Sequence, residues 1–209
     1  MAETLILHED PRSGNCYKIK LTAALLDLPL TTLPYDIMEG ETRTREFLEQ
    51  VNSNGCIPVL QIGEGPDARF LPESNAACWY LASGSDLIPS DRLAQADMLR
   101  WMFFEQYSHE PNLAVLRFWM QFVGADQLSA EQRAQIPAKR AASYDSLTVM
   151  EQQLGMQPFF AGGAANLADI ALYPYTHTAD EGGIALGDYP NVRSWIARME
   201  ALPSYISMA

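Results

Sequence analysis

The sequence is poor in the features that mark nucleic-acid-binding and membrane proteins. Its 209 residues include 14 basic and 26 acidic side chains, which gives a net charge of −12. Such a chain repels phosphate backbones and anionic lipid surfaces. No apolar run approaches the roughly 18 residues that a membrane span needs, and the opening Met-Ala-Glu-Thr-Leu lacks the basic start of a signal peptide. We therefore expect no nucleic acid and no membrane as partners, and a cytoplasmic location.

Cysteine and histidine are equally scarce, with three residues of each type. Cys16, Cys56 and Cys78 lie far apart, are odd in number and form no C-x-x-C pair. That spacing favours neither a disulfide framework nor a zinc site. The histidines are scattered as well, so we expect no metal site.

The first part of the chain has the pattern of an α/β domain. Short strands are predicted at about 4–8, 31–37, 58–62 and 68–71, with helices starting near residues 15, 45 and 74. The order strand, helix, strand, helix, strand, strand, helix is typical of a thioredoxin-like domain. Pro34 indicates an edge position for the second strand, because proline cannot donate to a sheet ladder.

The rest of the chain has helical periodicity. We predict a first domain over residues 1–83, a linker over 84–90 and an all-α domain over 91–209. Its helices are expected at about 92–122, 131–154, 167–180 and 192–202, and Pro111 should kink or break the first of them.

Two apolar runs punctuated by Gly and Pro form the most informative stretch. Pro58 stands just before Val-Leu and fits the first residue of a strand, where its peptide bond can be cis. Ile57 would then turn its backbone outward, where an extended peptide can pair with it. Glu73 and Ser74 precede a helical pattern, and there Ser and backbone N–H groups suit a carboxylate while Glu suits an ammonium. This layout predicts a small zwitterionic peptide as the ligand.

The pattern N-x-x-G-x-I-P-V-L over residues 52–60, followed by P-E-S-N-A over 72–76, resembles the glutathione-binding half of the glutathione S-transferase family. The Ser-Gly-Asn-Cys turn at 13–16 and the helix start at 166–170 extend the likeness over nearly the whole chain. The resemblance implies a thioredoxin-like domain followed by an all-α domain, with glutathione as a co-substrate and no bound cofactor. It also implies a small hydrophobic electrophile as the second substrate, and a homodimer. The long helix from Arg92, with Leu93, Met98 and Trp101, favours a homodimer too.

Three residues in the turn at 13–16 are candidates for catalysis. Ser13 can stabilise a glutathione thiolate through its hydroxyl, or it can simply cap the following helix. Asn15 can offer a second donor or act as a cap. Cys16 would lie in the first helical turn, where the helix dipole lowers a thiol pKa, but burial as a small hydrophobe is the commoner fate of a lone cysteine.

The remaining candidates concern binding. Ile57, Pro58, Glu73 and Ser74 are expected to bind glutathione. Cys56 departs from the family pattern, which often has Lys or Arg there. Phe104, Tyr107 and Arg117 are expected to line the second-substrate pocket. The Asn166-x-x-Asp169 helix start is read as structural.

These residues predict a glutathione transferase that conjugates the glutathione thiolate to small hydrophobic electrophiles. Two alternatives stay open. One is a glutathione-dependent disulfide reductase, in which glutathione or Cys16 exchanges with a disulfide. The other is a non-catalytic binding or interaction module that keeps the fold.

Overall fold

The computed structural model describes residues 3–208, so Met1, Ala2 and Ala209 at the ends of the two expected domains lie outside the described part. The chain divides into two compact units. The first runs to Ser85 and also takes the end of the chain from Leu202, and the second covers Asp86–Ala201. The tail thus groups with the first unit and not with the helical domain, where the sequence placed it. One reason is a hydrogen bond of 2.5 Å from the Tyr17 hydroxyl to the Ile206 carbonyl oxygen.

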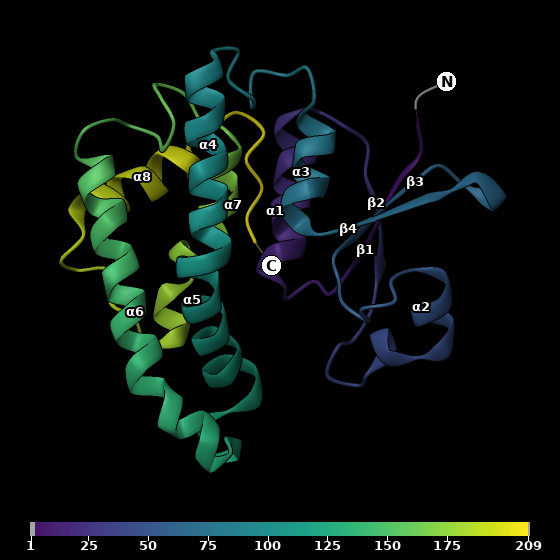
Figure 1. Ribbon diagram of the computed structural model, residues 1–209, viewed down its shortest axis with the longest axis horizontal. Helices are drawn as coiled ribbons and strands as arrows, with labels where there is room; N and C mark the ends of the chain where they lie inside the picture. Colours follow the sequence, from purple (N-terminus) through teal and green to yellow (C-terminus); the bar gives the residue numbers. More distant parts are fainter. Residues whose placement is uncertain (1–2, 209) are drawn as a thin grey trace. The chain divides into compact units, whose positions relative to one another are not determined.

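The first unit has the predicted thioredoxin-like order of elements (Figure 1). Its strands are β1 (Leu5–Glu9), β2 (Thr31–Pro34), β3 (Val59–Ile62) and β4 (Arg69–Pro72), and its helices are α1 (Gly14–Leu25), α2 (Arg45–Gln50) and α3 (Ser74–Ala82). The sheet order is β2-β1-β3-β4; β1 and β2 are parallel, and the other neighbours are antiparallel. Because β2 is an edge strand, the position inferred from Pro34 is confirmed.

The core of this unit lies between the sheet and the pair α1 and α3, which pack side by side (Figure 1). Leu7 of β1 and Leu60 of β3 face each other in register and are fully buried. Ile19 and Leu21 of α1 and Ala77 of α3 are also without exposed surface. Burial of this apolar set holds α1 and α3 against the sheet.

The loop expected after the first strand is less open than its polar sequence indicates. β1 extends to Glu9, and both Glu9 and Asp10 are buried. Glu9 forms an ion pair of 2.7 Å with Lys20. Buried charges of this kind require partners, because leaving water is costly for an unpaired carboxylate.

The second unit is helical throughout, as predicted. Its α-helices are α4 (Arg92–Phe104), α5 (Glu110–Arg117), α6 (Ala130–Leu154), α7 (Leu167–His177) and α8 (Pro190–Glu200). A π-helical segment, Glu105–His109, joins α4 to α5, and a second, Phe118–Val123, follows α5. The chain stays helical across Pro111, so the kink or break predicted there is instead a change of helix type; the proline lies in the first turn of α5, where its missing N–H is tolerated.

The helix start at Asn166 is the predicted capping box. Asp169 is fully buried and accepts hydrogen bonds from the Phe160 amide (3.1 Å) and the Trp195 indole (2.8 Å). Burial raises the pKa of Asp169 to about 7, against the opposing effect of these donors. Its role is to fix the start of α7 against the core, which agrees with the structural interpretation.

Two of the three side chains that motivated a dimer are part of the core. Met98 and Trp101 are buried, and only Leu93 is exposed, at 77%. Phe103 and Tyr107, which were not part of that argument, are exposed together with Leu93. Within residues 3–208, no helix is both long and apolar enough to cross a membrane.

Candidate functional site

The N-terminal ends of α1 and α3 meet in the first unit. The Ser74 hydroxyl, in the first turn of α3, donates to the Asn15 side-chain oxygen in the first turn of α1 at 3.3 Å. Residues from two sequence motifs 59 positions apart are therefore hydrogen-bonded to each other. Each helix start presents backbone N–H groups and the positive end of its dipole, an arrangement suited to negatively charged groups.

Ser13 is the N-cap of α1. Its backbone is extended, with φ −80° and ψ 123°, and its Oγ accepts a hydrogen bond from the Cys16 amide at 3.3 Å. Capping uses a lone pair of the hydroxyl and not its hydrogen, so the same group can still donate. The two roles considered for Ser13 are therefore compatible.

Cys16 lies in the core, with no exposed surface. Burial raises the pKa of its thiol to about 12, although hydrogen bonding with the Ser13 side chain and the Asp10 backbone opposes the shift. A thiol that stays neutral at physiological pH is a poor nucleophile, because the thiolate is the reactive form. This environment matches the buried-hydrophobe alternative.

The Ile57-Pro58 peptide bond is cis, as predicted. The β3 ladder begins at Val59, so the Ile57 backbone lies outside its pairing with β1 and β4. A pocket of about 220 Å³ opens beside it. The pocket is lined by Ile37, Thr42, Arg43, Gly55, Cys56 and Ile57.

Arg43 is a member of this pocket that the sequence did not single out. Its guanidinium donates to the Asn54 carbonyl oxygen at 2.9 Å. Gly55 allows this approach: its φ is +63°, and a Cβ there would lie 2.7 Å from the Arg43 Nη1. Arg43 thus supplies a cation beside Cys56, the position at which the family pattern often has one. The glycine of the N-x-x-G pattern was the available signal, since it marks a close approach to the backbone.

Glu73 has a strained backbone, with φ +74° and ψ 113°. Such a conformation is unfavourable for a residue with a Cβ and clusters at functional sites. Glu73 is exposed, while Ser74, the next residue, is buried at the start of α3. The exposed Glu73 side chain thus lies at the point where α3 begins.

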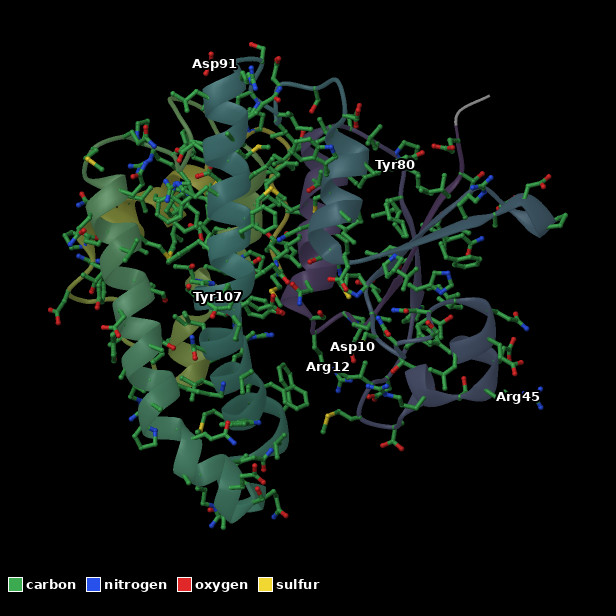
Figure 2. All side chains as sticks on the ribbon, in the orientation of Figure 1. Asp10, Arg12, Arg45, Tyr80, Asp91 and Tyr107 are labelled. Carbon is green, nitrogen blue, oxygen red and sulfur yellow. The ribbon has the colours of Figure 1, made fainter. Side chains whose placement is uncertain are left out.

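The residues expected to bind a second substrate lie in the second unit. Phe104 is half-buried and packs edge-on against Trp101, with ring centroids 5.1 Å apart. Tyr107 is 88% exposed (Figure 2). Arg117 is buried and forms an ion pair of 2.6 Å with Glu181, a contact that holds α5 to the segment after α7. Their role toward a second substrate stays a prediction.

Across the described residues, no group of three or more His, Cys, Asp and Glu side chains is arranged to hold a metal ion.

Comparisons with known proteins agree with this geometry. Residues 12–83 match the family model of the glutathione S-transferase N-terminal domain, and residues 101–203 match that of the C-terminal domain.

A solved glutathione S-transferase from Pseudomonas fluorescens is 44% identical, with a TM-score of 0.90 over 98% of both chains. A glutathione transferase from Burkholderia graminis, solved with two glutathione molecules bound per subunit, is 28% identical, with a TM-score of 0.83 over 96% of this chain and 85% of that one. The transcriptional regulator URE2 of Saccharomyces cerevisiae is 25% identical over 97% of this chain and 66% of its own length. The chain belongs to the glutathione S-transferase family.

Proposed function

We propose that this protein is a glutathione transferase that conjugates the glutathione thiolate to small hydrophobic electrophiles, with Ser13 as the thiolate donor. The observation that carries the proposal is the hydrogen bond between Ser74 and Asn15. It holds together two helix N-termini, one suited to a thiolate and the other to a carboxylate. A single small ligand with both groups can contact both ends.

Each part of glutathione has a matching group in the first unit. Amides at the start of α3 suit the γ-glutamyl carboxylate, toward which the Ser74 hydroxyl can also turn its one hydrogen from Asn15. The Glu73 carboxylate suits the ammonium. The outward backbone of Ile57 suits the peptide groups of the central cysteine. Arg43, on the wall of the 220 Å³ pocket, suits the carboxylate at the other end.

The chemical task of the site is to ionise the glutathione thiol. A free thiol has a pKa of about 8.5, so roughly 3% is thiolate at pH 7. A hydrogen bond to a charged acceptor contributes about 1.5–3 kcal/mol, equivalent to about one to two pKa units. One donated hydrogen bond from Ser13, assisted by the N-terminus of α1, is enough to make a large fraction of the bound thiol reactive.

The disulfide-reductase alternative fits the structure less well. It needs an accessible thiolate at Cys16, but that thiol is buried and its pKa is raised. The non-catalytic alternative has one supporting observation, the similarity to a protein named as a transcriptional regulator. A scaffold, however, needs neither the strained Glu73 nor the cation at Arg43.

Turnover with a panel of aryl halides, epoxides and organic disulfides distinguishes the three functions. Conjugation of aryl halides or epoxides with glutathione is the expected result. Disulfide reduction alone would favour the reductase, and glutathione binding without any turnover would favour the non-catalytic module.

We also propose the cytoplasm as its location. The three cysteines are all free, as in a compartment where glutathione keeps thiols reduced.

A further inference from the structure

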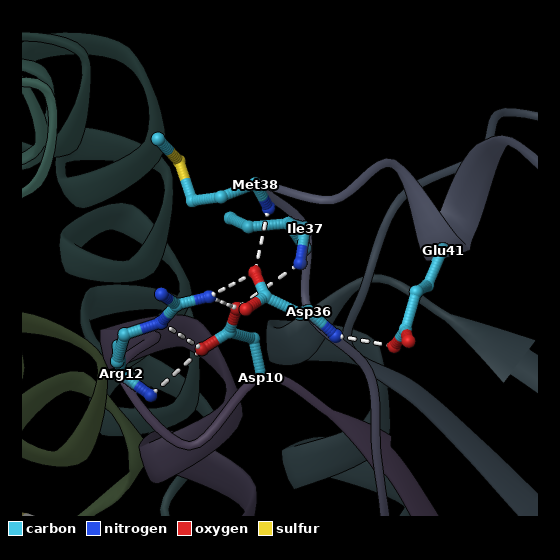
Figure 3. A network of polar contacts seen from close by, with 6 residues as sticks. All are labelled: Asp10, Arg12, Asp36, Ile37, Met38 and Glu41. Carbon is cyan, nitrogen blue, oxygen red and sulfur yellow. Dashed lines mark hydrogen bonds and ion pairs between the residues drawn. The ribbon is translucent and has the colours of Figure 1, made fainter.

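A charged cluster joins two loops of the first unit (Figure 3). Asp10 follows β1 and has no exposed surface. The Arg12 guanidinium donates to both of its carboxylate oxygens, from Nε at 2.8 Å and from Nη2 at 2.6 Å. The same Nη2 also reaches Asp36, after β2, at 2.6 Å. We refer to Asp10, Arg12 and Asp36 as the loop clamp.

The Asp10 carboxylate also binds the backbone of both loops. It accepts from the Arg12 amide at 3.0 Å, one residue before Ser13, and from the Ile37 amide at 3.3 Å. The Asp10 carbonyl oxygen in turn accepts from the Ser13 amide at 2.9 Å. A single residue therefore fixes the backbone of the Ser13 turn and that of Ile37, which lines the pocket.

Asp36 makes further hydrogen bonds to residues that lead to the pocket wall. Its carboxylate accepts from the Met38 amide at 2.8 Å, and its own amide donates to the Glu41 carboxylate at 2.6 Å. Glu41 begins the short helix Glu41–Arg43, which carries Thr42 and Arg43 into the pocket lining. Hydrogen bonds and short stretches of backbone therefore connect Ser13 to Arg43 through the loop clamp.

Stability alone does not account for such a cluster. Desolvation of a buried carboxylate offsets much of the attraction to its partner, so an apolar replacement of similar shape is often no less stable. Burial opposes ionisation of Asp10, yet its hydrogen bonds from Arg12 and Ile37 outweigh this effect and lower its pKa. What the charged arrangement adds is a fixed geometry, because a bidentate pair tolerates little rotation.

We propose that Asp10, Arg12 and Asp36 are positioning residues that hold the Ser13 hydroxyl at a fixed distance from the pocket. The inference rests on the proposed function, in which the pocket binds one end of glutathione and Ser13 contacts its thiol. The distance between the two loops then decides where the thiol lies relative to the hydroxyl. A misplacement of about 1 Å is enough to lower a rate by about a hundredfold.

The test compares Arg12→Gln, Arg12→Lys and Asp36→Asn with the wild type. Ultraviolet titration of the bound thiolate gives the thiol pKa, and steady-state kinetics give kcat and KM for glutathione. We expect Arg12→Gln to raise the bound thiol pKa by about one unit and to lower kcat at neutral pH about tenfold. Arg12→Lys should recover only part of the loss, because an ammonium cannot bind both carboxylate oxygens in the same plane.

The matched control is Arg45→Gln. Arg45, labelled in Figure 2, is an exposed arginine of the same unit. It pairs with Glu49 on α2, and its removal breaks a surface ion pair away from the loop clamp. The control should leave the thiol pKa and kcat unchanged. Asp36→Asn is the second variant, for use if Arg12→Gln does not fold. Its effect on folding should be smaller, because the Asp36 side chain is partly exposed.

The outcomes separate the two proposals. The positioning role is overturned if the wild type lowers the thiol pKa of bound glutathione and the variants have the same thiol pKa but reduced thermal stability. That result would leave the proposed function intact. A wild type that binds no glutathione or leaves its thiol at the free value would overturn the proposed function, and the positioning role with it.

Discussion

Two cysteines near the site have opposite surroundings. Cys16 is buried beneath the α1 N-terminus, whereas Cys56 is exposed on the wall of the pocket. The sequence left two roles open for Cys16, a reactive thiol in the first helical turn or a buried small hydrophobe, with burial as the commoner fate. Burial decides against the reactive thiol, since removing a thiolate from water raises its pKa.

We predict that a small alkylating agent modifies Cys56 in the folded protein and leaves Cys16 intact. The pKa of Cys16, at about 12, lies above that of an unfolded thiol, so the folded state keeps it protonated and unreactive from neutral pH up to at least pH 9. Intact-protein and peptide mass spectrometry count the modified sites. Rapid labelling of Cys16 at pH 8, before global unfolding, would refute this assignment.

At the same scale, the site was only partly predictable. Ser13, Ile57 and Glu73 were singled out because each belongs to a local sequence pattern with a structural reason, namely a helix cap, the residue before a proline and a helix start. Arg43 and Asp10 were missed because a charged residue in a polar loop looks solvent-exposed in sequence. The roles proposed for them depend on β1 and β2 lying side by side, which brings Asp10 and Arg12 next to Asp36 and Ile37.

At the scale of elements, the helix α3 begins on a strained residue. Glu73 has positive φ although most side chains avoid that region, and β4 ends only one residue earlier. The chain passes from strand to helix at this single residue. Strain of this kind costs about 1–3 kcal/mol and is retained where it orients a group.

We predict that Glu73→Gly makes the protein about 1 kcal/mol more stable while raising the KM for glutathione about tenfold. Glycine relieves the strain, and loss of the carboxylate removes the partner of the ammonium. Glu73→Ala is the control, because it should raise KM to a similar extent without a gain in stability. Thermal unfolding and steady-state kinetics measure both effects, and a kcat that falls at unchanged KM would contradict the binding role.

Hydrophobic periodicity predicted most of the helices and strands, but it did not predict which helical segments are α-helical and which are π-helical. The pattern over 92–122 predicted one helix interrupted at Pro111, whereas the structure alternates α- and π-helical turns there. The α- and π-forms bury nearly the same apolar positions, so hydrophobic spacing does not distinguish them. The grouping of residues 202–208 with the first unit depends on long-range contacts such as Tyr17 with Ile206, for which sequence has no local signal.

At the scale of the whole molecule, the second unit has large apolar side chains at its surface. Leu93, Phe103 and Tyr107 are 77%, 71% and 88% exposed, within one stretch of 15 residues. A concentration of large apolar groups at the surface marks an interaction site. A second copy of the chain is the partner that we propose.

We therefore predict a homodimer at micromolar concentration, measured by sedimentation velocity. Phe103→Glu should shift the protein toward the monomer, because a charge buried in a self-complementary interface is repeated by symmetry. Val149→Glu is the control, since Val149 is an exposed apolar residue on the separate helix α6. A wild type that sediments as a monomer would refute the dimer, whatever the variants do.

The central claim is that the Ser13 hydroxyl stabilises the thiolate of bound glutathione, and titration of that thiolate by its ultraviolet absorbance tests it most directly. The wild type should titrate about one to two units below the free value of about 8.5, and Ser13→Ala should return the midpoint most of the way to it. Ser129→Ala removes another serine N-cap, at the start of α6, with a similar loss of stability of about 1 kcal/mol, and should leave the midpoint unchanged. A wild-type midpoint at the free value, or an equal midpoint in Ser13→Ala and the wild type, would contradict the claim.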